Sequence, residues 1–243
     1  MLSAISTIFH AVVYNPLYNG LISLVSILPT HDVGIAVVLL TIVVRFILFP
    51  LSKRAVAAQL AMKKITPEIE ELKVKFKDDR EAQSKAIFKL YKDRGIHPFA
   101  GFALVLLQFP ILIGLYWVFA KGGLPMVDVT RLYAFVHAPS IVNMEFLGLL
   151  DMRSHSVLLA VTASVTQFTY TRLSMGAAGT KDPSPVESSL SGDMAKSFDL
   201  QARYVLPAMI GVISFSVSAA APLYWTTSNL FMIAQEYISG KRL

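Results

Sequence analysis

The chain contains no cysteine, and few of its residues carry a charge. The first absence excludes disulfide bonds, thiolate metal ligands, cysteine nucleophiles and cysteine-linked lipid anchors. Charged residues make up only 16% of the 243 residues, whereas hydrophobic residues make up 54%. A soluble domain carries about a quarter charged residues, and here the charges are clustered, so that long apolar runs remain. This composition predicts a polytopic membrane protein.

Lysine and arginine are absent from the first 44 residues. A secretory signal peptide begins with a basic region, and a mitochondrial presequence is rich in arginine. Neither kind of targeting segment fits this sequence. We therefore expect the N-terminal segment to remain on the mature protein.

Five apolar stretches reach or approach the roughly 20 residues that a helix needs to cross a bilayer. Each is expected to be a transmembrane helix, so the predicted fold is all-α, with a core of five spans over residues 33–243. The predicted spans are residues 33–51, 99–120, 156–174, 204–221 and 223–239.

The segment 1–32 precedes these spans and is harder to interpret. Pro16 and Pro29 divide it into pieces that are too short to span a membrane alone. Apolar residues such as Ile8 and Val12 recur at helical spacing between polar ones. This pattern predicts an amphipathic helix lying in the membrane interface. The alternative is one more transmembrane helix, kinked at Pro16.

Residues 52–98 hold more than half of all the lysine and arginine in the chain. Apolar residues recur every three or four positions over 65–76 and again over 87–91. The charged run 77–79 interrupts the pattern, and Gly95 ends it. The segment is therefore predicted to form two helices folded back on each other, as a short antiparallel coiled-coil hairpin outside the membrane.

The distribution of positive charge predicts the orientation, because basic loops stay in the cytoplasm. The basic hairpin is then cytoplasmic, and the uncharged N-terminus lies outside. The loop 121–155 is expected outside and the loop 175–203 inside. The chain is expected to end inside, with Lys241 and Arg242.

Arg45 lies within the first predicted span, about 9 Å of helix from its cytoplasmic end. A charge in the middle of a membrane costs ~2.5–3.5 kcal/mol even on the most lenient insertion scale. One interpretation is that the guanidinium snorkels to the inner headgroups. The other is that Arg45 is a functional residue that faces water inside the protein.

Polar residues in the other predicted spans favour the second interpretation. Hydrogen bonding between helices explains most serines and threonines there, and Asn229 with those of the fifth span, but it explains Gln108 and Gln167 less well, because their amides are costlier to bury. No acidic residue is predicted deep in a span, since Glu236 lies near the cytoplasmic end of the fifth. We therefore expect Arg45 to face a polar, water-filled cavity that opens to the cytoplasm and attracts anions.

Four blocks of the sequence resemble the YidC-type membrane protein insertases of the Oxa superfamily. The resemblance covers nearly the whole chain from about residue 31. The blocks are TIVVRFILFPLSKR at 41–54, PEIEELKVKFKDD at 67–79, LYKDRGIHPFAGFALVLLQFPILIGLYWVF at 90–119 and LYWTTSNLFMIAQEYI at 223–238. The resemblance implies five core spans, a cytoplasmic hairpin, and a hydrophilic groove that is open to the cytoplasm and to lipid but closed toward the outside.

The resemblance also implies which residues line that groove. The arginine of the family falls on Arg45, its polar neighbour one turn earlier on Thr41, and its last-span aromatic on Tyr224 or Trp225. With the polar residues found above, the candidate client-binding groove consists of Arg45, Thr41, Gln108, Gln167, Tyr224, Trp225 and Asn229. The candidate client-capture surface on the hairpin consists of Lys63, Lys64, Ile69, Leu72, Lys73 and Phe76.

The implied function is that of a membrane protein insertase and chaperone, not an enzyme. It moves short polar tails of client proteins through the groove and releases their apolar segments into lipid. No cofactor is expected, because the sequence has no nucleotide-binding glycine loop. The implied partners are newly made membrane proteins, the Sec translocon, the ribosome, the signal recognition particle pathway and anionic lipids. The chain lacks the long basic tail that helps some relatives to bind ribosomes.

Two other classes of function remain open at this point. A small channel or secondary transporter could use the same polar cavity, although such proteins usually show internal repeats or acidic ion ligands in broken helices. An intramembrane enzyme would need a serine elbow, a zinc motif or paired carboxylates in a span, and none is present.

Overall fold

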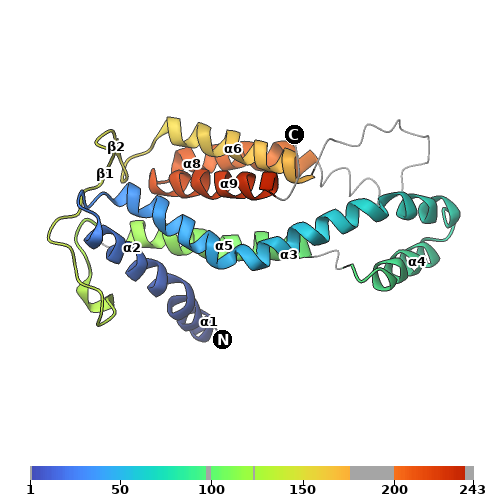
Figure 1. Ribbon diagram of the computed structural model, residues 1–243, viewed down its shortest axis with the longest axis horizontal. Helices are drawn as coiled ribbons and strands as arrows, with labels where there is room; N and C mark the ends of the chain where they lie inside the picture. The colour runs from blue at the N-terminus through green and yellow to red at the C-terminus, as the bar shows by residue number, and fades with distance from the viewer. Residues whose placement is uncertain (1, 97–99, 123, 176–199, 239–243) are drawn as a thin grey trace. The chain divides into compact units, whose positions relative to one another are not determined.

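The computed structural model describes residues 2–96, 100–122, 124–175 and 200–238 (Figure 1). It is mostly helical, as predicted. The helices are α1 (Leu2–Phe9), α2 (Asn15–Ile27), α3 (Val33–Lys75), α4 (Arg80–Asp93), α5 (Ala100–Lys121), α6 (Val157–Met175), α8 (Leu206–Ser216) and α9 (Ala220–Ile238). The shorter elements are the π-helical turns η1 (His10–Tyr14) and η3 (Gln201–Val205), the 3-10 turn η2 (Val129–Arg131), and the strands β1 (Glu145–Phe146) and β2 (Leu150–Asp151).

The chain divides into two compact units. The first comprises Met1–Ile47, Phe109–Gly179 and Ser189–Leu243, and the second comprises Leu48–Gln108 and Thr180–Ser188. Two long helices, α3 and α5, contribute residues to both units. The polar residues of α6 and α9 therefore belong to the first unit, and the basic hairpin belongs to the second.

The N-terminal helix does not break at Pro16. The elements α1, η1 and α2 follow one another from Leu2 to Ile27 without a gap, so the expectation that this proline divides the segment is wrong. Proline lacks an N–H group and cannot make the helical hydrogen bond. The π-helical turn directly before α2 places Pro16 in the first turn of a new helix, where that bond is not needed.

Two helical segments of the described residues, Ser6–Ile27 and Val33–Ala58, are long and apolar enough to cross a membrane. The helix α3 begins where the first span was predicted, but it is 43 residues long and continues past the predicted end of that span, through Pro50 and Pro67. The predicted first span and the first arm of the predicted hairpin are thus one helix.

The remaining predicted spans fall on shorter helices. The helices α5, α6 and α9 lie over the second, third and fifth predicted spans. The fourth is shorter than predicted, because α8 ends at Ser216, and Val217 is extended. That these helices cross a bilayer remains a prediction.

The helix α6 packs against both α8 and α9 in the first unit (Figure 1). Small residues allow this close approach, since Ala160 and Ala163 of α6 are buried. A Cβ atom at Gly211 of α8 would lie only 3.2 Å from the Cβ of Ser164. The Ser164 hydroxyl donates a hydrogen bond to the carbonyl of Pro207 at 2.9 Å, which also links α6 to α8. Small residues and hydroxyl bonds of this kind are typical of helix pairs in membranes.

Buried polar side chains of α2 anchor the long loop between α5 and α6. The amide of Asn19 is 2% exposed, donates to the carbonyl of Arg131 at 3.0 Å and accepts from the Tyr133 N–H at 2.6 Å. Directly before η2 in the same loop, the Asp128 N–H donates to the Tyr18 hydroxyl at 2.8 Å. The loop is therefore an ordered part of the first unit.

An ion pair closes this part of the loop. The Arg131 guanidinium lies 2.8 Å from the Asp128 carboxylate and stacks over the Tyr14 ring. Hydrogen bonds from Thr130 and from Arg131 hold the pKa of Asp128 below its usual range. The stabilisation from these bonds is present at neutral pH and is lost as the pH falls through the lowered pKa.

Asp32 joins the start of α3 to the β1–β2 hairpin. Its carboxylate caps the helix by accepting from the Ile35 N–H at 3.0 Å, and it also accepts from the Leu147 N–H at 2.8 Å. Gly34 is needed beside it, because any Cβ atom there would collide with the Phe146 ring. The sequence analysis did not predict this β-hairpin.

In the second unit, α4 folds back on the end of α3. Asp79 caps α4 by accepting from the Ala82 N–H at 3.0 Å, and Gly95, with φ +62°, follows the end of that helix. Two contacts link the helices: the Gln83 side chain donates to the carbonyl of Lys73 at 3.0 Å, and Arg94 forms a bidentate pair with Glu68. The chain thus turns between Lys75 and Arg80, and α4 ends before Gly95; that this pair of helices stands in the cytoplasm remains a prediction.

Replacing Asp32 with alanine should lower the free energy of unfolding by about 1–3 kcal/mol, because it removes a helix cap and a second hydrogen bond, from the Leu147 N–H. The matched control is Asp151→Ala, which breaks an exposed pair with Arg153 and should cost less than about 1 kcal/mol. Thermal unfolding of the detergent-solubilised variants, followed by circular dichroism, measures both. Equal losses would show that the Asp32 joint does not stabilise the fold.

Candidate functional site

Arg45 is the one charged residue of α3 in the first unit, and it is held against α9. Its side chain is 7% exposed. The guanidinium Nε donates a hydrogen bond to the Ser228 hydroxyl at 2.8 Å, and Nη2 donates to the same oxygen. Next to this contact in the sequence, one residue after Arg45 and three after Ser228, the rings of Phe46 and Phe231 meet edge to face at 5.1 Å. A polar and an apolar contact thus join the same two helices.

The expectation that Arg45 faces water is wrong for this conformation. A side chain that is only 7% exposed is surrounded by protein. The physical reason is that a hydroxyl from α9 supplies an acceptor, so bulk water is not needed to satisfy these donors. Snorkelling is not observed either, because the guanidinium turns toward the neighbouring helix.

Other predicted polar residues lie buried on the helices α3, α6 and α9. The Thr41 hydroxyl, one turn before Arg45, donates to the carbonyl of Val37 in its own helix at 2.6 Å. The Gln167 amide donates to the Thr171 hydroxyl at 3.2 Å. These are local bonds within one helix, so they satisfy the polar atoms without joining the helices.

Asn229 joins α9 to α6. Its side chain is fully buried, and its amide nitrogen lies 3.4 Å from the Thr166 hydroxyl. Its Oδ1 accepts no hydrogen bond from any residue that the structure describes. A second contact, between the hydroxyls of Thr162 and Thr226 at 3.4 Å, runs between the same two helices. The α6–α9 interface is therefore polar over at least one turn of each helix.

Glu236 is buried, which the sequence did not predict. Its side chain is 1% exposed, although its position near the end of α9 suggested contact with water. Tyr170 of α6 interacts electrostatically with both Glu236 and Arg45 and hydrogen-bonds to Ser174. The side chains of Arg45 and Glu236 thus both interact with one tyrosine.

The remaining predicted groove residues differ in burial. Tyr224 is buried and interacts electrostatically with Arg45, whereas Trp225 is half-buried. Gln108 is half-buried in α5. It belongs to the second unit, at the end of the segment Leu48–Gln108.

The predicted capture residues all lie on the part of α3 that belongs to the hairpin, or directly after it. Lys64 is exposed, and Ile69, Leu72, Lys73 and Phe76 are half-buried. The side chain of Lys63 lies outside the described part of the structure. The partial burial of the apolar members fits a seam that packs against α4 while leaving some apolar surface open.

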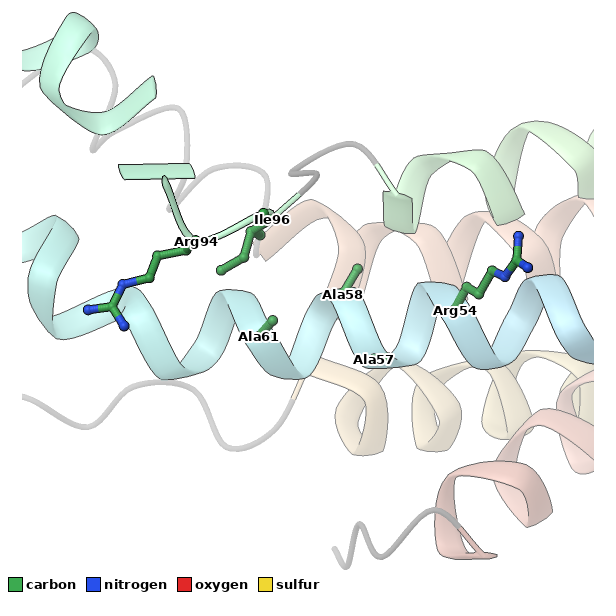
Figure 2. A pocket seen from close by; sticks show the side chains of 7 residues that line it. Arg54, Ala57, Ala58, Ala61, Arg94 and Ile96 are labelled. Carbon is green, nitrogen blue, oxygen red and sulfur yellow. The ribbon is translucent and has the colours of Figure 1, made fainter. Parts of the chain in front are cut away.

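A shallow pocket of about 360 Å³ lies at the base of the hairpin, in the second unit. Its lining residues are Arg54, Ala57, Ala58, Ala61, Arg94, Gly95 and Ile96. Figure 2 shows the guanidinium groups of Arg54 and Arg94 reaching away from the alanines in opposite directions. Arg94 is also paired with Glu68, so the two arginines do not converge on one point.

Three residues of the buried cluster were not predicted as site residues: Ser228, Tyr170 and Glu236. Serine in a membrane helix is usually a packing residue, so nothing in the local sequence distinguished Ser228. Its role depends on Arg45, which lies 183 positions earlier in the chain. We name the set Arg45, Tyr170, Tyr224, Ser228 and Glu236 the arginine cluster.

The fold and this buried cluster define a helical membrane protein with a charged site among its apolar helices. Comparison with known proteins gives the family. The chain matches the 60Kd inner membrane protein family over residues 25–243. It therefore belongs to that family, the YidC-type membrane protein insertases, as the sequence motifs indicated.

Individual relatives differ in length. A membrane protein insertase YidC from Clostridium tetani is 29% identical over 213 residues, which are 88% of this chain and 84% of the relative. The YidC of Oceanobacillus iheyensis is 27% identical over 86% of this chain and 74% of the relative. The YidC of Neisseria gonorrhoeae is 30% identical over 84% of this chain, but this match spans only 32% of the relative.

The contact between Arg45 and Ser228 predicts a coupling energy. In a double-mutant cycle that combines Arg45→Met with Ser228→Ala, the stability changes should depart from additivity by about 1.5–3 kcal/mol, the range for a hydrogen bond to a charged group. The control cycle uses Thr227→Ala, because that hydroxyl bonds to Leu223 within its own helix. Its coupling to Arg45 should stay below about 0.5 kcal/mol. Unfolding in detergent measures both cycles, and equal couplings would contradict the contact.

Proposed function

We propose that this protein is a bacterial inner membrane protein insertase, in which the arginine cluster receives the polar tail of a client. The observation that carries the proposal is a buried arginine that donates to a serine hydroxyl of a neighbouring helix, in a chain of the insertase family. A client tail enters from the cytoplasm and crosses part of the membrane beside Arg45. The apolar segment of the client then moves into lipid.

The proposed role of Arg45 follows from the strength of hydrogen bonds to a guanidinium. In the resting protein, a neutral hydroxyl of Ser228 accepts from it. A carboxylate on the client would replace that hydroxyl with a negatively charged, bidentate acceptor, which adds an opposite charge and a second hydrogen bond. Low-dielectric surroundings increase the attraction further. The exchange therefore favours tails that carry acidic residues.

The proposed topology has five spans on α3, α5, α6, α8 and α9. The N-terminus and the loop between α5 and α6 lie outside, and the C-terminus lies in the cytoplasm, because the basic residues are concentrated in the hairpin. The helix from Leu2 to Ile27 is proposed to lie along the interface, with the exposed side chains of Ile8 and Val12 in lipid. Gln108 and Trp225 are proposed to line the client path.

The hairpin is proposed to capture clients before they reach the arginine cluster. Its exposed lysines and half-buried apolar seam suit a newly made membrane protein, and its net positive charge suits anionic headgroups. The Sec translocon, the ribosome and the signal recognition particle pathway are proposed partners that deliver such clients.

Replacing Arg45 with glutamate should reduce the insertion of a client with an acidic tail by roughly tenfold or more, because the charge then repels the tail. Insertion of a client with a neutral tail should change much less. Arg45→Lys should retain partial activity, since the charge remains but the bidentate geometry is lost. Protease protection of clients in proteoliposomes measures insertion, and circular dichroism confirms folding. Unchanged insertion of the acidic client would remove Arg45 from the mechanism.

An ion-flux assay on the same proteoliposomes separates the insertase from a channel or transporter. The proposal expects client insertion without a sustained ion current. Ion flux that depends on Arg45, together with no insertion of any client, would favour the transport alternative.

The capture role predicts that positive charge on the α3 arm of the hairpin contributes more to client binding than positive charge on the α4 arm. The double variant Lys64→Glu, Lys73→Glu should lower photo-crosslinking of a client to position 76 by roughly twofold or more, because attraction to the client is replaced by repulsion. The matched control reverses two exposed lysines of α4, Lys85 and Lys89. An equal loss in both variants would indicate a general charge effect.

A further inference from the structure

The turn between β1 and β2 presents two large apolar side chains to the surroundings. Leu147 is 61% exposed and Leu149 is 82% exposed. The turn is fixed by a hydrogen bond from the Leu149 N–H to the carbonyl of Phe146 at 3.0 Å, and by pairing of Phe146 with Leu150. The two leucines are therefore held in place on an ordered hairpin.

Leucine is a poor choice for this turn on conformational grounds. Leu147 has φ +56° and Gly148 has φ +70°, so both central residues are in the left-handed region. Such type I′ turns favour asparagine and glycine, because a bulky side chain is strained there. A leucine at this position is costly in backbone energy and also exposes apolar surface to water. A contact that removes the leucine side chain from water would offset both of these costs.

The hydrogen bonds of Asp32 hold the turn beside the first residues of α3. The same carboxylate that accepts from the Leu147 N–H also caps α3, whose first residue is Val33. A parallel bridge between Asp32 and Asn143 holds the preceding part of the loop at the same level. The tip of the hairpin thus lies at the end of a helix that is long and apolar enough to span a bilayer.

We propose that the hairpin tip, formed by Leu147 and Leu149, inserts into the headgroup–acyl boundary of the leaflet at the N-terminal end of α3. The occupant of this surface is lipid. The depth set by Asp32 matches that boundary, and apolar side chains partition into it. The exposed ion pair of Asp151 with Arg153, at the base of the hairpin, suits the polar headgroup layer above.

This proposal rests on the proposal that α3 crosses the membrane, but not on client insertion. Other exposed apolar side chains of the same loop, Met126 and Phe135 among them, could extend the contact with lipid. The tip would then set the depth of α3, and through α3 the depth of Arg45.

The natural absence of cysteine allows a direct test, because any introduced cysteine is the only site for a thiol-reactive label. The variant Leu149→Cys is labelled with an environment-sensitive fluorophore, and the full chain is reconstituted in phosphatidylcholine vesicles. Two reference variants are Lys77→Cys, in the charged turn between α3 and α4, and Val43→Cys, on the exposed face of α3. Quenching is measured with aqueous iodide and with a headgroup spin-labelled lipid.

The proposal expects iodide quenching at position 149 to be at least roughly threefold weaker than at position 77, with headgroup quenching stronger than at either reference position. Adding Leu147→Asn, which suits the turn and so preserves the hairpin, should raise iodide quenching at position 149. Iodide quenching equal to that at position 77 would overturn the proposal. Protection from both quenchers would also overturn it, because protein would then cover the tip.

The insertion assay on the same vesicles keeps the two proposals apart. Normal client insertion with a water-exposed tip would contradict only the lipid contact. A lipid-inserted tip without client insertion would contradict only the insertase mechanism.

Discussion

The burial of Arg45 is the constraint on which the rest of the first unit depends. A guanidinium carries five donors and one charge, and neither is tolerated among apolar helices without partners. The chain answers with a hydroxyl at Ser228, tyrosines at 170 and 224, and a buried carboxylate at Glu236. Polar residues on α6 and α9 that would be hard to explain singly are together the surroundings that a buried cation requires.

The helix α3 is held at two points in this unit. Asp32 ties its first turn to the β1–β2 hairpin, and Arg45 ties it to α9. The two residues are thirteen positions apart, or about 20 Å along a helix. Because both attachments are buried and hydrogen-bonded, neither can move far without exposing an unsatisfied group. The position of Arg45 is therefore coupled to the structure of a loop at the other end of the helix.

Composition and motifs predicted the mostly helical class and the family, because apolar periodicity and short motifs are local features of the sequence. What they missed depends on distant partners. Pro16 was expected to break a helix, but a π-helical turn directly before α2 lets the helical segment continue through it. Leu147 gave no turn signal, since its left-handed conformation depends on Gly148 and on a bond to Asp32. The environment of Arg45 was misjudged because its acceptor lies 183 residues away.

The position of Ser228 explains how the guanidinium can be buried and still exchange partners. Ser228 and Glu236 lie on the same helix, eight residues apart, or about 12 Å along it. Tyr170 interacts with both Arg45 and Glu236, so polar groups of α6 and α9 form one connected set around the guanidinium. The Ser228 hydroxyl offers the guanidinium a single neutral oxygen. An incoming client carboxylate offers two oxygens and a negative charge, so the exchange adds a bidentate contact and the attraction of opposite charges.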